Sequence, residues 1–292
     1  MAASWLRAHD DVTNNISSSC NEQALDQLDE VFDRKRLERV TVMDTNMGDK
    51  ISFDIYEPEA TCFSEERFGS KTETRYRSFG DGPKFICGVD YIAHQTAHYG
   101  KNCLVYSVGS NNDIAFEKAV HTFMKGCEIH TFDPTLNKPF VGGEYAIFHP
   151  WGLGVDGEKA SAGGKAWEGK SFDTVFKELG HENRSVDVLK IDCEGCEWDV
   201  MPPLFELMRS GRVKVDQILI ELHLGKLNNN ATKLKSFFWS ADKAKMRLFH
   251  KERNGWGCQG THCAEYAFAR ETFLREANRD TVCPQTPVER RP

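Results

Sequence analysis

Four ionisable side chains that could perform acid–base chemistry lie near the ends of two apolar, strand-like runs. The first run, residues 186–191, leads directly into the acidic turn D-C-E-G-C, and the second, residues 217–224, carries an acid and a histidine. Such groups can take a proton from a substrate hydroxyl. The four candidate catalytic residues are Asp192, Glu194, Glu221 and His223.

A structural role is the alternative hypothesis for these four residues. Asp, Glu and Gly are common in strand-to-helix turns, a histidine at a strand end often makes a structural hydrogen bond, and Glu221 could pair with a helix cap. In open α/β sheets, however, ligands bind outside the carboxyl ends of the strands. The position of the acids is therefore compatible with a functional site, and the remaining segments of the sequence decide between the two hypotheses.

Cysteines cluster around the same turn. Cys193 and Cys196 form a C-x-x-C pair, a spacing found in redox and zinc sites, and Cys258 and Cys263 form a second pair in another segment. A four-cysteine zinc site would require the two loops to meet. We expect disulfides or free thiols instead, and no metal site.

The elements that must position these groups begin at Cys103, where strand-like and helix-like patterns start to alternate. Residues 104–108 are predicted as a buried strand, residues 109–111 as a tight loop before a helix, and residues 128–132 as the next strand. Alternation of this kind predicts an α/β fold with a parallel sheet and helices on its faces.

The loop after the first of these strands and the acid after the second are typical of adenosine-binding sheets. Glycine lets the backbone approach a ligand, and the acid can accept hydrogen bonds from both ribose hydroxyls. Gly109 and Asp133 are 133 − 109 = 24 residues apart, but the G-x-G-x-x-G that admits a pyrophosphate is absent. S-adenosylmethionine therefore fits better than NAD. The predicted cofactor-binding residues are Gly109, Ser110, Asn111, Asp133, Asp192 and, beside the adenine, Gly152.

The later segments continue the pattern and end in a closing antiparallel hairpin, which argues against an NAD-dependent dehydrogenase. The predictions are a third strand at 145–149, a loop at 157–169, helix caps at Ser171 and Thr232, and hairpin strands at 246–250 and 263–269.

The expected organisation is one α/β domain with an N-terminal addition. It comprises a tail over 1–18, a helix and cap region over 19–100, the main domain over 101–275 and a tail over 276–292. The N-terminal helix is predicted to start at Ser19, with Glu22 completing a capping box. Two cysteine pairs are expected to lie close enough for disulfides, namely Cys62 with Cys87 and Cys103 with Cys127.

Composition narrows the classes of partner. The net charge is −7, and no run of basic residues is longer than Arg34-Lys35-Arg36, which argues against a nucleic-acid partner. We also expect no membrane span, because the longest apolar stretches are only strand-sized, and no secretory signal. The chain as written is expected to be soluble. Its compartment stays open, cytoplasmic or, if a signal or anchor is missing, the lumen of the secretory pathway.

Three motifs in order carry a resemblance to a known family. The stretches CLVYSVGSNNDIAFE, GCEIHTFDP and KIDCEGCEW resemble those of FkbM-related methyltransferases, and more closely those of the animal methyltransferase-like proteins, over residues 62–268. The resemblance implies a class I, S-adenosylmethionine-dependent fold with a seven-stranded sheet and an antiparallel closing strand. It places residues 109–111 under the methionine part of the cofactor, Asp133 at the ribose, and Asp192 and Glu194 at the methyl-transfer zone.

Many FkbM-like enzymes methylate hydroxyl groups of sugars or other small compounds, so the resemblance implies O-methylation of a small-molecule or glycan acceptor. Asn112 departs from the pattern, because related loops often have glycine there. The alternative function is a non-catalytic binding module that retains the fold and modifies nothing.

Overall fold

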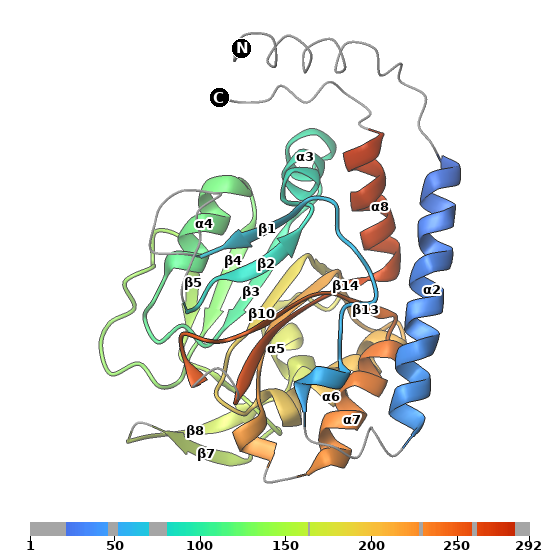
Figure 1. Ribbon diagram of the computed structural model, residues 1–292. Helices are drawn as coiled ribbons and strands as arrows, with labels where there is room; N and C mark the ends of the chain where they lie inside the picture. Colours follow the sequence, from blue (N-terminus) through green and yellow to red (C-terminus); the bar gives the residue numbers. More distant parts are fainter. Residues whose placement is uncertain are drawn as a thin grey trace, which may run out of the picture.

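The structure, a computed structural model, describes residues 22–45, 52–69, 81–162, 164–227, 230–258 and 262–283. A seven-stranded sheet with the order β13-β14-β12-β10-β3-β4-β5 forms its centre (Figure 1). Strands β12, β10, β3, β4 and β5 run parallel to one another, whereas β14 is antiparallel to both of its neighbours. This confirms the predicted α/β class with a mostly parallel sheet and an antiparallel closing strand. The strands are β3 (Leu104–Val108), β4 (Glu128–Phe132), β5 (Ile147–His149), β10 (Val188–Ile191), β12 (Gln217–His223), β13 (Met246–Arg253) and β14 (Cys263–Arg270).

Helices pack on both faces of this sheet (Figure 1). Successive strand residues point to opposite faces, so Leu104 and Tyr106 of β3 enter one core with α5, α6 and α7, while Val105 enters another with α3, α4 and α8. Burial on both faces explains why the central strands are continuously apolar in sequence. The helices are α2 (Glu22–Asp44), α3 (Val89–Tyr99), α4 (Ala115–Phe123), α5 (Phe172–Leu179), α6 (Glu197–Arg209), α7 (Ala231–Lys243) and α8 (Glu271–Val282). Among the described residues, no helix is both long enough and apolar enough to cross a lipid bilayer.

The closing hairpin inserts its second strand into the sheet. β14 pairs with β12 on one side and with β13 on the other, and seven of its eight residues are buried. In the β12–β14 register, Glu221 lies opposite Glu265 and His223 lies opposite Cys263. The hairpin therefore brings an acid and a cysteine beside two of the predicted catalytic residues.

The N-terminal region packs closely on the main domain. Its strands β1 (Glu65–Phe68) and β2 (Lys84–Cys87) form an antiparallel pair, and the Lys84 side chain at the start of β2 is 1% exposed. Helix α2 is attached through Arg39, whose guanidinium lies 2.7 Å from Glu59 and 3.2 Å from Asp242 of α7. The region thus contributes buried side chains to the domain that it covers.

Two predicted cysteine pairs are confirmed as disulfides. Cys62 and Cys87 are bonded with a Cα–Cα distance of 5.8 Å, and Cys103 and Cys127 with a distance of 4.4 Å. The first links the segment before β1 to the end of β2, and the second joins the residues that precede β3 and β4.

Several local predictions were wrong. The expected loop at 157–169 contains a hairpin of β7 (Lys159–Ala162) and β8 (Lys165–Lys170), whose antiparallel register sets Lys159 opposite Glu168 and Ala160 opposite Trp167. Asn230, not Thr232, caps α7, since the Asn230 side chain accepts a hydrogen bond from the Lys233 amide. The Ser171 cap of α5 is confirmed, while the predicted start at Ser19 lies outside the described residues.

The C-terminal boundary also differs from the prediction. Helix α8 continues to Val282, past the expected tail start at 276, because Asn278 is buried and bonded to the Phe63 amide and the Thr61 carbonyl. The third strand is shorter than predicted and begins at Ile147. The remaining short elements are η2 (Phe53–Ile55), β6 (Gly152–Leu153), β9 (Ser185–Val186), β11 (Lys214–Val215) and η3 (Leu224–Leu227).

Candidate active site

A cavity of about 1160 Å³ lies at the carboxyl ends of β3, β4, β10 and β12. Its volume is at the upper end for small-molecule sites, which reach roughly 1000 Å³. His223 is not among its lining residues, although it lies on the same sheet edge. The predicted site residues that line the cavity are Gly109, Ser110, Asn111, Asp133, Gly152, Asp192, Glu194 and Glu221.

Gly109 allows the ends of β3 and β10 to meet. Its φ is +77°, and a Cβ at this position would lie only 1.7 Å from the Asp192 carbonyl oxygen. The Lys190 ammonium, itself nearly buried at the cavity wall, donates to the Gly109 carbonyl. Asn111 and Asn112 then follow with φ values of 45° and 62°, a left-handed conformation that Asn tolerates better than most residues. The loop is therefore shaped by backbone contacts.

Asp133 organises this loop. One carboxylate oxygen accepts from the backbone amides of Ser110 (3.0 Å) and Asn111 (2.8 Å), and the other accepts from the Thr135 amide (2.8 Å) and hydroxyl (2.6 Å). Burial opposes ionisation of Asp133, but these hydrogen bonds outweigh it and lower the pKa of the carboxyl. Both oxygens are thus engaged with the chain itself, and a role toward a ribose stays a prediction.

Aromatic residues flank the predicted adenine region. Gly152 lies against the Trp167 indole, whose Nε1 would be 1.9 Å from an added Cβ, so only glycine fits there. Trp151 lines the same wall, packed against His149 with ring centroids 4.6 Å apart. Trp151 and Trp167 thus line the cavity with two indoles, and the Lys170 ammonium lies 4.8 Å from the centroid of the Trp151 ring.

Asp192 shares a buried cation with Glu265. The Lys84 ammonium lies 3.3 Å from Asp192 Oδ2 and 2.5 Å from Glu265 Oε1, and its side chain is 1% exposed. Burial opposes ionisation of Asp192, but the positive charges of Lys84, Lys190 and His223 together outweigh it and lower the pKa of this carboxyl to about 2. Burial and the nearby Glu221 and Asp192 raise the pKa of Glu265, although Lys84 works against this rise. Asp192 is therefore held as a carboxylate.

Glu221 lies beside this cluster and faces the cavity. Its Oε1 accepts a hydrogen bond from Asn254 Nδ2 at 2.8 Å, and Asn254 also binds Asp81 at 2.6 Å. Burial, followed by the negative charge of Asp192, raises the pKa of Glu221 to about 7. This carboxyl is 4% exposed yet lines the cavity, so it is sheltered from bulk water and still accessible to a ligand.

His223 is held by a carboxylate that the sequence prediction did not include. Glu197 is fully buried and accepts from the His223 amide (2.9 Å), His223 Nδ1 (3.0 Å) and the Gly195 amide (2.8 Å). Burial lowers the pKa of His223, but the hydrogen bond to Glu197 and the negative charges of Glu197, Glu221 and Asp192 together outweigh it and raise the pKa to about 9. Nε2 of His223 lies 3.5 Å from Glu194, whose own side chain is 78% exposed and whose φ is +57°.

The two cysteine pairs near the site form separate disulfides. Cys193 bonds to Cys196 in the turn between β10 and α6, and Cys258 bonds to Cys263 at the start of β14. A four-cysteine zinc site is therefore not formed by these residues.

Lys84, Lys190, Glu197 and Glu265 belong to the site but were missing from the sequence prediction. Glu197 had a signal, because it is the last acid of the KIDCEGCEW motif. Glu265 had none, since the sequence predicted that its strand pairs with 246–250 but not that it also pairs with β12. Lys84 lies in the N-terminal region, far from the acids in sequence, and only the packing of β2 brings it to them.

Comparison with known proteins identifies relatives. A family model described as "Methyltransferase domain" matches residues 12–270. The rat protein named "Probable methyltransferase-like protein 24" is 28% identical over 185 residues, which cover 58% of this chain and 48% of the relative. The human protein of the same name is 26% identical over 175 residues, covering 56% and 46%. The chain thus spans about half the length of these curated relatives.

Solved structures with a similar arrangement are more distant. The fibrillarin pre-rRNA processing protein of Methanococcus jannaschii aligns with a TM-score of 0.37 and 10% identity, covering 59% of this chain and 67% of that one. The O-methyltransferase from Bacillus cereus in complex with SAH aligns with a TM-score of 0.37 and 10% identity, covering 62% and 80%. The resemblance to FkbM-related proteins is supported at the level of a methyltransferase domain and no finer.

Proposed function

Because the chain belongs to the methyltransferase-domain family, we propose that it transfers a methyl group from S-adenosylmethionine to a hydroxyl acceptor, on a small molecule or a glycan. The observation that carries the proposal is the convergence of Asp192, Glu194 and Glu221 on one cavity with the Gly109–Asn111 loop. Carboxylates at that place can receive the proton that a hydroxyl loses when it is methylated.

The residues of the cavity suit this cofactor. The wall at Trp151 and Gly152 carries aromatic side chains of the kind that stack on an adenine ring, and the nearly buried Lys190 provides a positive charge for a carboxylate. Asp133 keeps the loop in its left-handed conformation and is the predicted acceptor for ribose hydroxyls, which would have to share its oxygens with the loop amides. When bound, S-adenosylmethionine supplies an electrophilic methyl group on a sulfonium.

Among the candidate bases, Glu221 is favoured by its surroundings. Asp192 is engaged by the Lys84 ammonium, and Glu194 is largely exposed to solvent, where its charge is screened. Glu221 lines the cavity, and among the described residues Asn254 is its hydrogen-bond donor within 3 Å, which leaves lone pairs for a substrate. In this proposal Glu221 takes the acceptor proton, Asp192 orients the cationic donor, and His223 positions Glu194 through its 3.5 Å contact.

Calorimetric titration with S-adenosylmethionine, S-adenosylhomocysteine and NAD tests the cofactor assignment. We expect binding of the first two and none of NAD. Release of S-adenosylhomocysteine across a panel of sugars and small alcohols then tests the reaction, with Glu221→Gln as the test variant. Glu206→Gln is the matched control, because Glu206 is 61% exposed and is not among the cavity residues.

The titration and the panel separate this proposal from the alternative. If the chain binds the cofactor but neither the parent nor the variant turns over any acceptor, the result would favour a non-catalytic binding module. Tight binding of NAD in place of S-adenosylmethionine would refute the cofactor assignment.

A further inference from the structure

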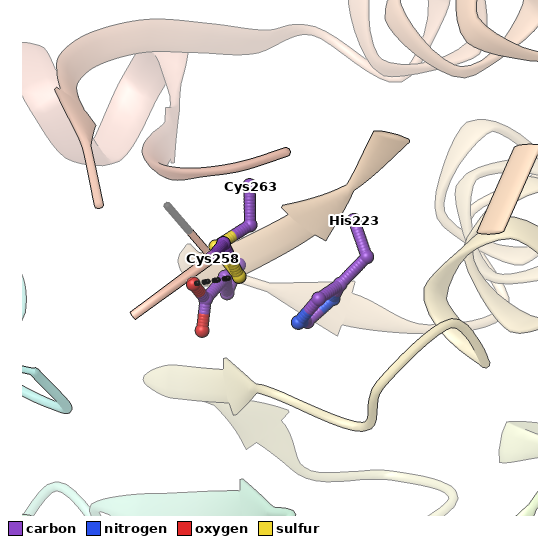
Figure 2. Close-up of side chains that lie close together, drawn as sticks. His223, Cys258 and Cys263 are labelled. Atoms are coloured by element: carbon purple, nitrogen blue, oxygen red, sulfur yellow. Dashed lines mark hydrogen bonds between the residues drawn. A yellow bond between two sulfur atoms is a disulfide. The ribbon is translucent and has the colours of Figure 1, made fainter. Parts of the chain in front are cut away.

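Four side chains capable of binding a metal converge beside the cavity. Glu221 and His223 come from β12, Cys263 lies opposite His223 on β14, and Cys258 lies in the segment that leads to β14. One ligand atom of each residue lies within 4.8 Å of the others. Figure 2 shows Cys258 and Cys263 joined by their disulfide, with the His223 ring alongside.

His223 is arranged as metal-binding histidines are. Its Nδ1 is bound to the fully buried Glu197, which fixes the ring, while Nε2 makes no hydrogen bond within the described part of the chain and lies 3.5 Å from the exposed Glu194 carboxylate. The residue itself is 5% exposed. Metal-binding histidines almost always give their second nitrogen to a carboxylate or carbonyl in this way. A buried nitrogen that makes no hydrogen bond among the described residues and lies beside two sulfur atoms is the second observation that points to a ligand.

We propose that reduction of the Cys258–Cys263 disulfide creates a zinc site whose ligands are Cys258, Cys263, His223 and Glu221. Two thiolates, one imidazole and one carboxylate are ligands that zinc accepts in tetrahedral sites. A dithiol reductant gives two electrons and two protons to the disulfide and itself becomes a disulfide, leaving two thiols. Zinc then displaces the two thiol protons and the proton on His223 Nε2 as these groups coordinate, and the protons pass to the buffer.

Other acid and histidine clusters are less suited to a metal. At Glu128, His130 and His181, the Arg184 guanidinium already lies 2.7 Å from Glu128 and 3.2 Å from His181 Nε2, so a cation occupies the space. The acids around Lys84 are likewise neutralised by its ammonium. The group at Glu221 combines two sulfur atoms with a buried imidazole nitrogen that makes no hydrogen bond among the described residues.

Zinc at this place would occupy the carboxylate of Glu221. On the proposed function, methyl transfer and zinc binding would then exclude each other, and the redox state of Cys258 and Cys263 would select between them. This consequence rests on the proposed function, whereas the metal site itself does not.

Metal binding by the intact chain tests the site without any assay of methyl transfer. The chain is reduced with a phosphine, freed of metal by chelation and buffer exchange under nitrogen, and titrated with Co²⁺ and then Zn²⁺. We expect one tightly bound ion per reduced chain, with the intense ultraviolet absorption of cobalt–thiolate bonds, and none in the oxidised chain. Cys258→Ser should weaken binding at least ~10-fold and reduce that absorption.

The control is the double variant Cys193→Ser/Cys196→Ser, which removes the neighbouring pair and should bind the ion as the parent does. A reduced chain that binds no ion would overturn the proposal. So would binding that survives Cys258→Ser unchanged, or binding that is lost in the Cys193→Ser/Cys196→Ser variant. None of these outcomes depends on whether the chain transfers methyl groups.

Discussion

The Lys84 ammonium lies 2.5 Å from Glu265 Oε1, although the two residues are 181 positions apart in sequence. Lys84 comes from the N-terminal strand β2, Glu265 from the strand β14 that closes the sheet, and Asp192 lies 3.3 Å from the same ammonium. The pair therefore joins the N-terminal region to the carboxyl edge of the sheet, directly behind the proposed methyl-transfer site.

Replacing Lys84 should strongly destabilise the fold. Lys84→Met leaves the buried Glu265 and the partly buried Asp192 without their cation, which costs about 3–5 kcal/mol for a broken buried pair. Urea denaturation followed by circular dichroism measures the loss. Lys177→Met is the control, because the Lys177–Asp173 pair is exposed and contributes at most about 0.5 kcal/mol. Equal losses in the two variants would contradict the buried ion pair, and adding Glu265→Gln to Lys84→Met should recover part of the stability.

Removing the charge of Glu221 should abolish most of the turnover while the protein remains folded. Glu221→Gln keeps the shape and the Asn254 contact but cannot accept the acceptor proton, so we expect a decrease in kcat of at least ~100-fold. Melting temperature is measured in parallel with release of S-adenosylhomocysteine. Normal turnover by this variant would indicate that the catalytic base is Asp192, Glu194 or His223. The variants Asp192→Asn, Glu194→Gln and His223→Gln would then test these three residues.

Loss of Asp133 should weaken cofactor binding through the loop that it holds. Asp133→Ala frees the amides of Ser110 and Asn111, and charge-assisted hydrogen bonds of this kind are worth more than ~1.5 kcal/mol, or at least ~10-fold in Kd. Calorimetry with S-adenosylhomocysteine measures the change, with the exposed Asp173→Ala as control. An unchanged Kd in a folded Asp133→Ala protein would show that neither the loop nor the ribose depends on this acid.

The stability of the chain should fall on acidification because of His149. Burial, followed by the nearby His130 and His181, lowers the pKa of His149 from 6.5 to about 4. At a pH between these two pKa values, the unfolded chain binds a proton at His149 and the folded chain does not. The stability that the neutral His149 contributes is therefore complete above pH 6.5 and is lost as the pH falls toward 4. His149→Phe retains an aromatic ring against Trp151 and removes the titration.

The midpoint of urea denaturation is measured for parent and variant at about pH 7.5, 5.5 and 4. These pH values cover the range over which an ordinary histidine titrates. The variant should lose less stability than the parent over this range. Parallel losses in both proteins would show that His149 does not exclude its proton on folding.

Local patterns in the sequence were sufficient to predict the framework of the site. The strand at 186–191, the loop at Gly109 and the acid at Asp133 were recognisable because strand periodicity, glycine in a tight turn and a polar residue at a strand end are properties of adjacent residues. The pair Cys103–Cys127 followed from the expected strand neighbours, and the pair Cys62–Cys87 from the loop that these two cysteines bracket. These features depend on short stretches of chain and can therefore be predicted from the sequence.

The surroundings of the acids were decided by the tertiary structure alone. Insertion of β14 between β12 and β13 sets Glu265 opposite Glu221 and Cys263 opposite His223, and the packing of β2 delivers Lys84 to the same place. Whether an acid is ionised depends on which charges lie within a few ångströms and on how much water is excluded. Those quantities come from residues far apart in the chain, which is why the sequence located the acids but only the fold determined that Asp192 is held charged and that Glu221 is sheltered.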